Sequence, residues 1–119
     1  TGMPEYCVSK LANVLFTKSL VAKYGARGVA AFALHPGVVA TDIWRSLPGP
    51  VEWVIKRFMI TPEEGAATTL HCATARDLEA QSGAYFDKCR PVRENRLASD
   101  VALAEELWSR SAAWCGLPA

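Results

Sequence analysis

Apolar residues recur at helical spacing through the first 24 positions of the chain. Pro4 suits the first turn of a helix, where its missing N–H would have no partner, and the pattern continues from there to about Tyr24. One face carries Val8, Leu11, Ala12, Leu15 and Ala22, and the positions beside it add Val14, Phe16, Leu20 and Val21. This apolar surface is wider than an ordinary amphipathic stripe. We therefore expect a helix over residues 4–24 that is buried on more than one side.

A continuous apolar run, VAAFAL at residues 29–34, follows two glycines. Gly25 and Gly28 are expected to end the first helix, because glycine suits a left-handed cap. An uninterrupted apolar run of this length is typical of a parallel strand covered on both faces. The run ends in HPGVVATD, and open α/β sheets place ligands at the carboxyl ends of their strands. Position alone makes this turn a candidate site.

Two further helices are predicted in the middle of the chain. Residues 44–60 contain a Pro-Gly-Pro break at positions 48–50, followed by a short amphipathic helix whose apolar residues include Trp53, Phe58 and Met59. A second helix is expected from Pro62 to about Ala75. Thr61 would cap it, and Glu64 three residues later completes a capping-box pattern.

The last part of the chain predicts one strand and one helix. Residues 82–89, SGAYFDKC, indicate a short strand, and CRPVREN after it indicates a polar connection. The final helix would be capped by Ser99 or Asp100 and ended by Gly116 and Pro118.

This order of elements predicts an α/β fold with one domain. Two parallel strands joined by a helical crossover form one unit of a doubly wound, Rossmann-type sheet. Two strands are too few to be stable alone, because a parallel sheet needs neighbouring strands and helices on both faces. We expect this chain to be the C-terminal part of such a sheet, with the remainder upstream, and to be only marginally stable by itself.

Composition narrows the function classes. Thirteen basic and twelve acidic residues give a net charge of +1, without the basic surface that nucleic acids require. No apolar run is long enough to suggest a membrane span or a signal segment. The four cysteines are far apart in the sequence, which indicates reduced thiols: Cys7, Cys72, Cys89 and Cys115.

The strongest chemical motif is the pair Tyr6 and Lys10. Residues at i and i+4 share a helix face, so the ammonium can lie near the phenol and favour its phenolate form. Tyrosine titrates near pH 10 in water, and such stabilisation would make it a usable acid or base at neutral pH. By itself, Y-x-x-x-K also fits a surface tyrosine beside a solvated lysine.

Five segments in order resemble the short-chain dehydrogenase/reductase family, and within it the retinol dehydrogenase branch. They are YCVSKLANVLFT, ALHPGVVATDI, TPEEGAATTLHCA, SGAYFDKC and AEELW, and together they cover nearly the whole chain. The resemblance implies hydride transfer between a nicotinamide cofactor, NADP or NAD with NADP favoured, and a lipophilic alcohol or aldehyde such as retinol or retinal.

The resemblance also implies roles for six residues. Tyr6 would exchange a proton with the substrate oxygen, and Lys10 would hold the nicotinamide ribose and stabilise the phenolate. Pro36, Gly37 and Val38 would form a turn against the nicotinamide, with a backbone contact from Val38 to its carboxamide. Thr41 would bond near the carboxamide or the pyrophosphate.

Parts of the family pattern are missing from this sequence. It has no G-x-G-x-x-G phosphate turn, and only five residues precede Tyr6, too few to include the family's catalytic serine and asparagine. We therefore expect the 119-residue chain to be inactive alone.

Other polar and aromatic residues have structural interpretations. His35 and His71 have no second ligand at metal spacing, so no metal site is predicted. Asp42 is expected to cap its loop. Trp108 and Trp114, on the last helix, are expected to pack in the core.

Three functions stay open. The first is the nicotinamide-dependent oxidoreductase. The second is an inactive interaction module, which would form a homodimer through residues 4–24, a face that the family often uses for this purpose. The third is a membrane-surface module built on residues 44–60, which the family uses as a substrate flap and which also fits a plain core helix. For the whole protein, the resemblance implies an intracellular location and leaves the compartment open, with endoplasmic reticulum and mitochondrial membranes as candidates.

Overall fold

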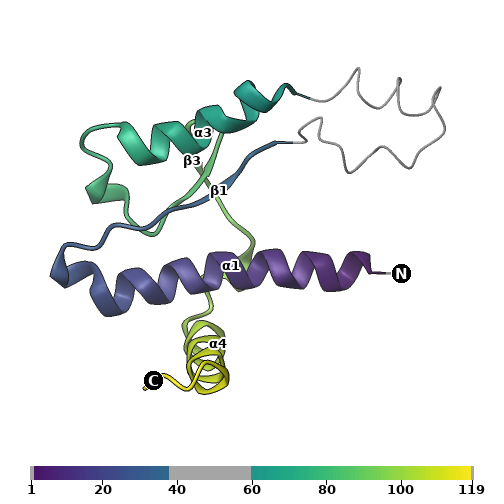
Figure 1. Cartoon of the computed structure of the whole chain (residues 1–119), viewed down its shortest axis with the longest axis vertical. Coiled ribbons are helices and arrows are strands. Elements are labelled where there is room, and N and C mark those ends of the chain that lie inside the picture. The colour runs from purple at the N-terminus through teal and green to yellow at the C-terminus, as the bar shows by residue number, and fades with distance from the viewer. Residues whose placement is uncertain (1, 38–59, 119) are drawn as a thin grey trace.

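The computed structural model describes residues 2–37 and 60–118, and its helices and strands follow the predicted order (Figure 1). The α-helices are α1 (Met3–Tyr24), α3 (Pro62–Thr74) and α4 (Val101–Trp114). The strands are β1 (Ala33–His35), β2 (Tyr85–Asp87) and β3 (Arg90–Val92). Short 3₁₀ turns connect them: η1 (Gly25–Arg27), η3 (Glu79–Gln81) and η4 (Arg96–Ser99). The α/β class is confirmed.

The sheet has the order β1-β2-β3 and contains both kinds of pairing. β1 and β2 are parallel, with α3 in the connection between them, as the crossover unit predicts. Both strands are shorter than the predicted ranges 29–34 and 82–89. His35 lies opposite Asp87, so the carboxyl ends of the two strands coincide.

The polar connection predicted after residue 88 is wrong, because part of it forms β3. Lys88 and Cys89 have φ angles of 49° and 60°, and this left-handed pair closes a two-residue hairpin between β2 and β3. All three residues of β3 are exposed, so the strand has no alternation of buried and exposed positions that a sequence could reveal. Its proline suits an edge strand.

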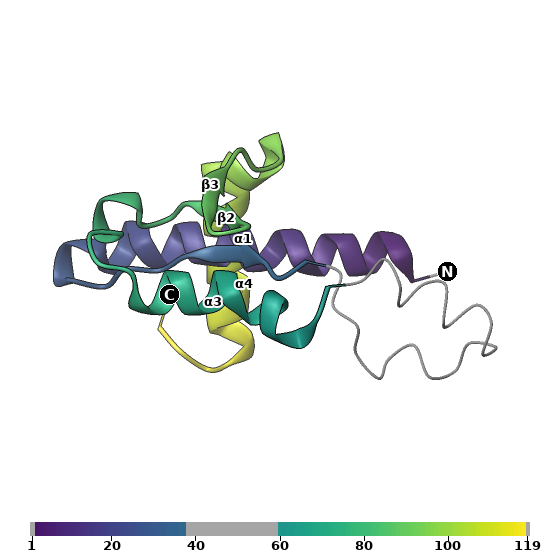
Figure 2. The ribbon, with the colours of Figure 1, turned by 90° about the horizontal axis from the view of Figure 1, so that it is seen from above.

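The elements stack in layers, with α3 on one side of the strands, α1 on the other and α4 beyond α1 (Figure 1). Seen from above, α4 crosses α1 steeply (Figure 2). Phe86 of β2 is fully buried, and its ring makes a T-shaped contact with Phe32 and lies near His71. Small residues fill much of the remaining core, which comprises Leu15, Ala33, Leu78, Ala98, Ala104 and Ala112.

The middle of α1 is buried on two faces, as predicted, but its first turns are not. Leu15 and Thr17 are both buried although they point about 200° apart around the helix. On the side of α4, Ser19 Oγ donates a hydrogen bond to the Ala104 carbonyl at 3.1 Å, and Phe16 stacks on Trp108. By contrast, residues 2–10 are all exposed.

Helix termini follow the sequence with one exception. Thr61 and Glu64 form both bonds of the capping box, and Asp100 accepts from the Leu103 amide at 3.0 Å. Gly25, however, keeps a right-handed helical conformation because the chain continues into η1, and Gly28 takes the left-handed position with φ of 83°. α1 thus ends at Tyr24 with Gly25 as its C-cap, where it was predicted to end, but only Gly28 has the left-handed conformation.

The two tryptophans of α4 have different fates. Trp108 packs between Phe16 and Tyr24 of α1, which confirms its structural role. Trp114 is 78% exposed, so the prediction that it packs in the core was wrong.

The predicted helix in 44–60, apart from Ile60, and the cap at Asp42 lie outside the described residues. None of the helices in the described part of the chain is both long and apolar enough to cross a bilayer.

Candidate functional site

Tyr6 and Lys10 lie together on the exposed first turns of α1. The Lys10 ammonium nitrogen is 5.2 Å from the centre of the Tyr6 ring, so the two side chains converge, as their i,i+4 spacing predicts. The Tyr6 side chain is 57% exposed. A phenol that exchanges a proton with a bound molecule must be accessible in this way.

Tyr6 and Lys10 line a cavity of about 570 Å³ that also reaches the carboxyl end of β1. Tyr6 and Lys10 line it from α1, and Pro36 and Gly37 line it from the turn after the strand. The structure thus gathers four of the six predicted site residues around one space. Val38 and Thr41 lie outside the described residues. The volume is within the range of small-molecule sites.

The Pro-Gly turn has a conformation that only glycine adopts easily. Gly37 has a φ of 84°, and a Cβ placed on it would collide with the side chain of Ile60. The Gly37 amide donates a hydrogen bond to His35 Nδ1 at 2.8 Å, which holds the turn closed. His35 therefore has the structural role that was predicted for it.

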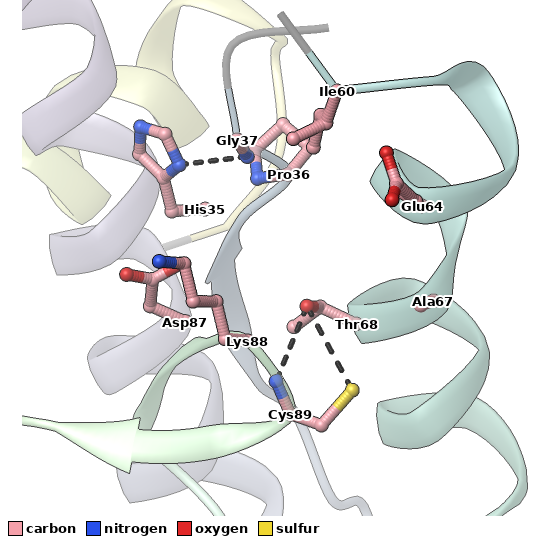
Figure 3. A pocket seen from close by; sticks show the side chains of 10 residues that line it. All are labelled: His35, Pro36, Gly37, Ile60, Glu64, Ala67, Thr68, Asp87, Lys88 and Cys89. Atoms are coloured by element: carbon pink, nitrogen blue, oxygen red, sulfur yellow. Dashed lines mark hydrogen bonds between the residues drawn. The ribbon is translucent and has the colours of Figure 1, made fainter.

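A second cavity, of about 580 Å³, borders the same turn (Figure 3). His35, Pro36 and Gly37 line this cavity too, so the turn is a wall shared by both spaces. The opposite walls are α3 and the β2–β3 hairpin, which contribute Glu64, Ala67, Thr68, Asp87, Lys88 and Cys89.

Sequence reasoning missed these hairpin residues and also Tyr85. Asp87 ends the strand beside β1, so the rule that ligands bind at the carboxyl ends of parallel strands could have found it. Tyr85 lines the cavity of Tyr6 and Lys10 from β2. Burial raises the pKa of Tyr85, and the negative charge of Asp87 raises it further. Tyr85 therefore offers this cavity a protonated hydroxyl.

Metal ligation finds no support in the described part of the chain. No group of three or more histidine, cysteine, aspartate or glutamate side chains gathers there in a way that could hold an ion. His71 lies near the Phe86 ring, with 6.0 Å between ring centres, and thus packs against the core.

Comparison with known proteins finds retinol dehydrogenases and another oxidoreductase among the relatives of this chain. Human retinol dehydrogenase 12 is 42% identical over 94% of this chain, and human retinol dehydrogenase 11 is 38% identical over 95%. The Drosophila melanogaster WW domain-containing oxidoreductase is 34% identical over 92% of the chain. No family model matches the sequence. The chain spans about a third of the length of these relatives, between 28% and 36%.

Proposed function

Because the chain carries sequence of the short-chain dehydrogenase/reductase family, in its retinol dehydrogenase-like branch, we propose that it supplies the proton-transfer half of a nicotinamide-dependent oxidoreductase. One observation carries the proposal: Tyr6, Lys10 and the Pro-Gly turn line a single cavity. The other parts of the reaction centre and the nucleotide-binding turn would come from residues outside this sequence. The 119-residue chain alone should therefore be inactive.

In this proposal the nicotinamide supplies or accepts the hydride, and NADP is the favoured cofactor. Lys10 would bind its ribose hydroxyls, Pro36, Gly37 and Val38 would lie against its ring, and Thr41 would bond near the carboxamide or pyrophosphate. The Tyr6 hydroxyl would donate a proton to the carbonyl oxygen during reduction and accept it from the alcohol during oxidation. The Lys10 ammonium would stabilise the phenolate that remains after donation.

The substrate we propose is a lipophilic alcohol or aldehyde of the retinol and retinal type. The residues that line the cavity beside Tyr6 include three large apolar ones, Val14, Phe32 and Leu34. Burial of a hydrocarbon chain there would stabilise the complex by about 25 cal/mol per Å² of apolar surface removed from water. A short aldehyde would bury little apolar surface against these residues, so its complex would be stabilised much less.

The test is retinal reduction by the complete polypeptide that contains this chain, with NADPH and NADH compared. Tyr6→Phe should lower kcat by about 10²- to 10⁴-fold while nicotinamide binding is retained, because only the transferable proton is lost. Tyr24→Phe is the matched control, since Tyr24 packs on Trp108 at the far end of α1. Unchanged turnover in Tyr6→Phe, or failure of the complete polypeptide to bind nicotinamide, would contradict the proposal.

A second candidate is an interaction role for the exposed part of α1, including homodimer formation through residues 4–24. Met3 and Val8 are 67% and 66% exposed, which leaves apolar surface on the first turns of the helix. Light scattering coupled to size exclusion would detect a dimer, and Val8→Glu should dissociate it. A complete polypeptide that remains monomeric at all concentrations would refute this role. Membrane association of the whole protein, at the endoplasmic reticulum or mitochondria, is a separate proposal that vesicle flotation would test.

A further inference from the structure

Two of the four free cysteines lie on elements that face each other across the second cavity. Cys89 is in the β2–β3 hairpin and Cys72 is on α3, and both are partly buried, whereas Cys7 and Cys115 are exposed. The hairpin is attached to α3 through Thr68. The Cys89 amide donates to Thr68 Oγ1 at 3.3 Å, and Cys89 Sγ lies 4.0 Å from the same oxygen (Figure 3).

Cys72 follows Thr68 by one helical turn and is therefore on the same face of α3. Side chains of a helix lean towards its N-terminus, so the Cys72 thiol leans towards Thr68. The sulfur of Cys89 lies beside the hydroxyl of the same threonine. Burial raises the pKa of Cys72, and the charge of Cys89 raises it further.

We propose that Cys72 and Cys89 are a modification site: a dithiol that a small disulfide oxidant, such as glutathione disulfide, converts into an intramolecular disulfide. The bond would join α3 to the β2–β3 hairpin. Because Thr68 and Cys89 line the second cavity, oxidation would tie two of its walls together beside the Pro-Gly turn.

The chemistry takes two exchange steps. The Cys89 thiolate attacks one sulfur of glutathione disulfide, which forms a mixed disulfide and releases the first glutathione as a thiolate. The Cys72 thiolate then attacks the Cys89 sulfur and releases the second glutathione. Two cysteine thiols are oxidised and one glutathione disulfide is reduced to two glutathiones, which take up the two protons. Cys72 reacts second because its raised pKa lowers the fraction of the thiol that is deprotonated, and only the thiolate attacks a disulfide.

The experiment is a titration of the full chain with mixtures of reduced and oxidised glutathione, quenched with an alkylating reagent and digested with trypsin. Each cysteine then lies in a separate peptide, because arginine or lysine residues separate all four in the sequence. A joined pair of peptides 58–76 and 89–93 reports the Cys72–Cys89 bond. We expect this pair to dominate, with Cys7 and Cys115 still alkylated or carrying only glutathione.

Matched variants and a denatured control make the result decisive. Cys72→Ser should leave a glutathione on Cys89 without any joined peptides, whereas Cys7→Ser should not change the Cys72–Cys89 yield. In concentrated urea the preference should disappear, because it depends on the folded contact of Cys89 with Thr68. Equal amounts of several pairings in buffer, or full alkylation of Cys72 and Cys89 at every glutathione ratio, would overturn the proposal.

Discussion

Substitution of Gly37 by alanine tests whether the Pro-Gly turn is held by the geometry that the structure shows. Two costs are expected. The φ of 84° is left-handed, and an L-residue with a Cβ pays about 1–2 kcal/mol there. The new methyl group would also collide with Ile60, and overpacking of this kind typically costs about 1–3 kcal/mol. Gly37→Ala should therefore lower the free energy of unfolding by about 2–5 kcal/mol.

Two further variants separate these costs. Gly28 has nearly the same φ, 83°, but a Cβ there would meet no atom within 4 Å, so Gly28→Ala should show the conformational cost alone. Ile60→Val removes the atom with which the new methyl group collides, so Gly37→Ala combined with Ile60→Val should lose about 1 kcal/mol less than the sum of the single changes.

The measurement is urea unfolding of the complete polypeptide that contains this chain, followed by circular dichroism, with the same slope required for all variants. If Gly37→Ala is no more destabilising than Gly28→Ala, the contact with Ile60 does not exist in solution. If the double variant is strictly additive, the collision is not what makes alanine unfavourable at this position.

The remaining predictions concern the core and the helix contacts, and all use the same unfolding measurement. Phe86→Ala should cost about 3–5 kcal/mol because it empties the centre of the core, whereas Trp114→Ala, at an exposed position, should change stability by less than about 0.5 kcal/mol. Ser19→Ala should cost about 1 kcal/mol, since it deletes the buried bond to α4. The hydrogen bond from Lys18 is the main cause that lowers the pKa of Glu94, so this carboxylate stabilises the fold above its ordinary pKa of 4.5 and loses that contribution as the pH falls through its folded value. Glu94→Gln should therefore reduce the loss of stability between about pH 7 and pH 3, and an unchanged pH profile would refute this account.

Local signals in the sequence were sufficient where a structural feature depends on near neighbours. The capping box at Thr61 and Glu64 and the convergence of Tyr6 with Lys10 depend only on residues three or four positions apart. The strand-end rule located the Pro-Gly turn for a similar reason, because an apolar run followed by a turn is visible in one short segment.

Features that depend on pairing between distant segments could not be predicted in this way. The sequence does not show that Tyr85 would share a cavity with Tyr6, because that follows from the register of β1 with β2. Nor does it show β3, whose residues are exposed and whose hairpin places two non-glycine residues, Lys88 and Cys89, in left-handed conformations. Trp114 is a large apolar residue of the kind that usually lies in a core. Its exposure depends on how α4 crosses α1, which the sequence does not show.

Because the middle of α1 is buried and its first turns are exposed, a small change in the direction of the helix axis would displace its N-terminal residues. Leu15 is fixed in the core, and Tyr6 precedes it by nine residues, or about 14 Å along the axis at 1.5 Å per residue. Over that length a bend of about 5° would move the phenol by roughly 1 Å, a displacement that can cost a well-aligned reaction about 10²-fold in rate. Side chains at the crossing with α4, such as Phe16 and Ser19, would therefore affect the alignment of Tyr6, the proposed proton donor, from a distance.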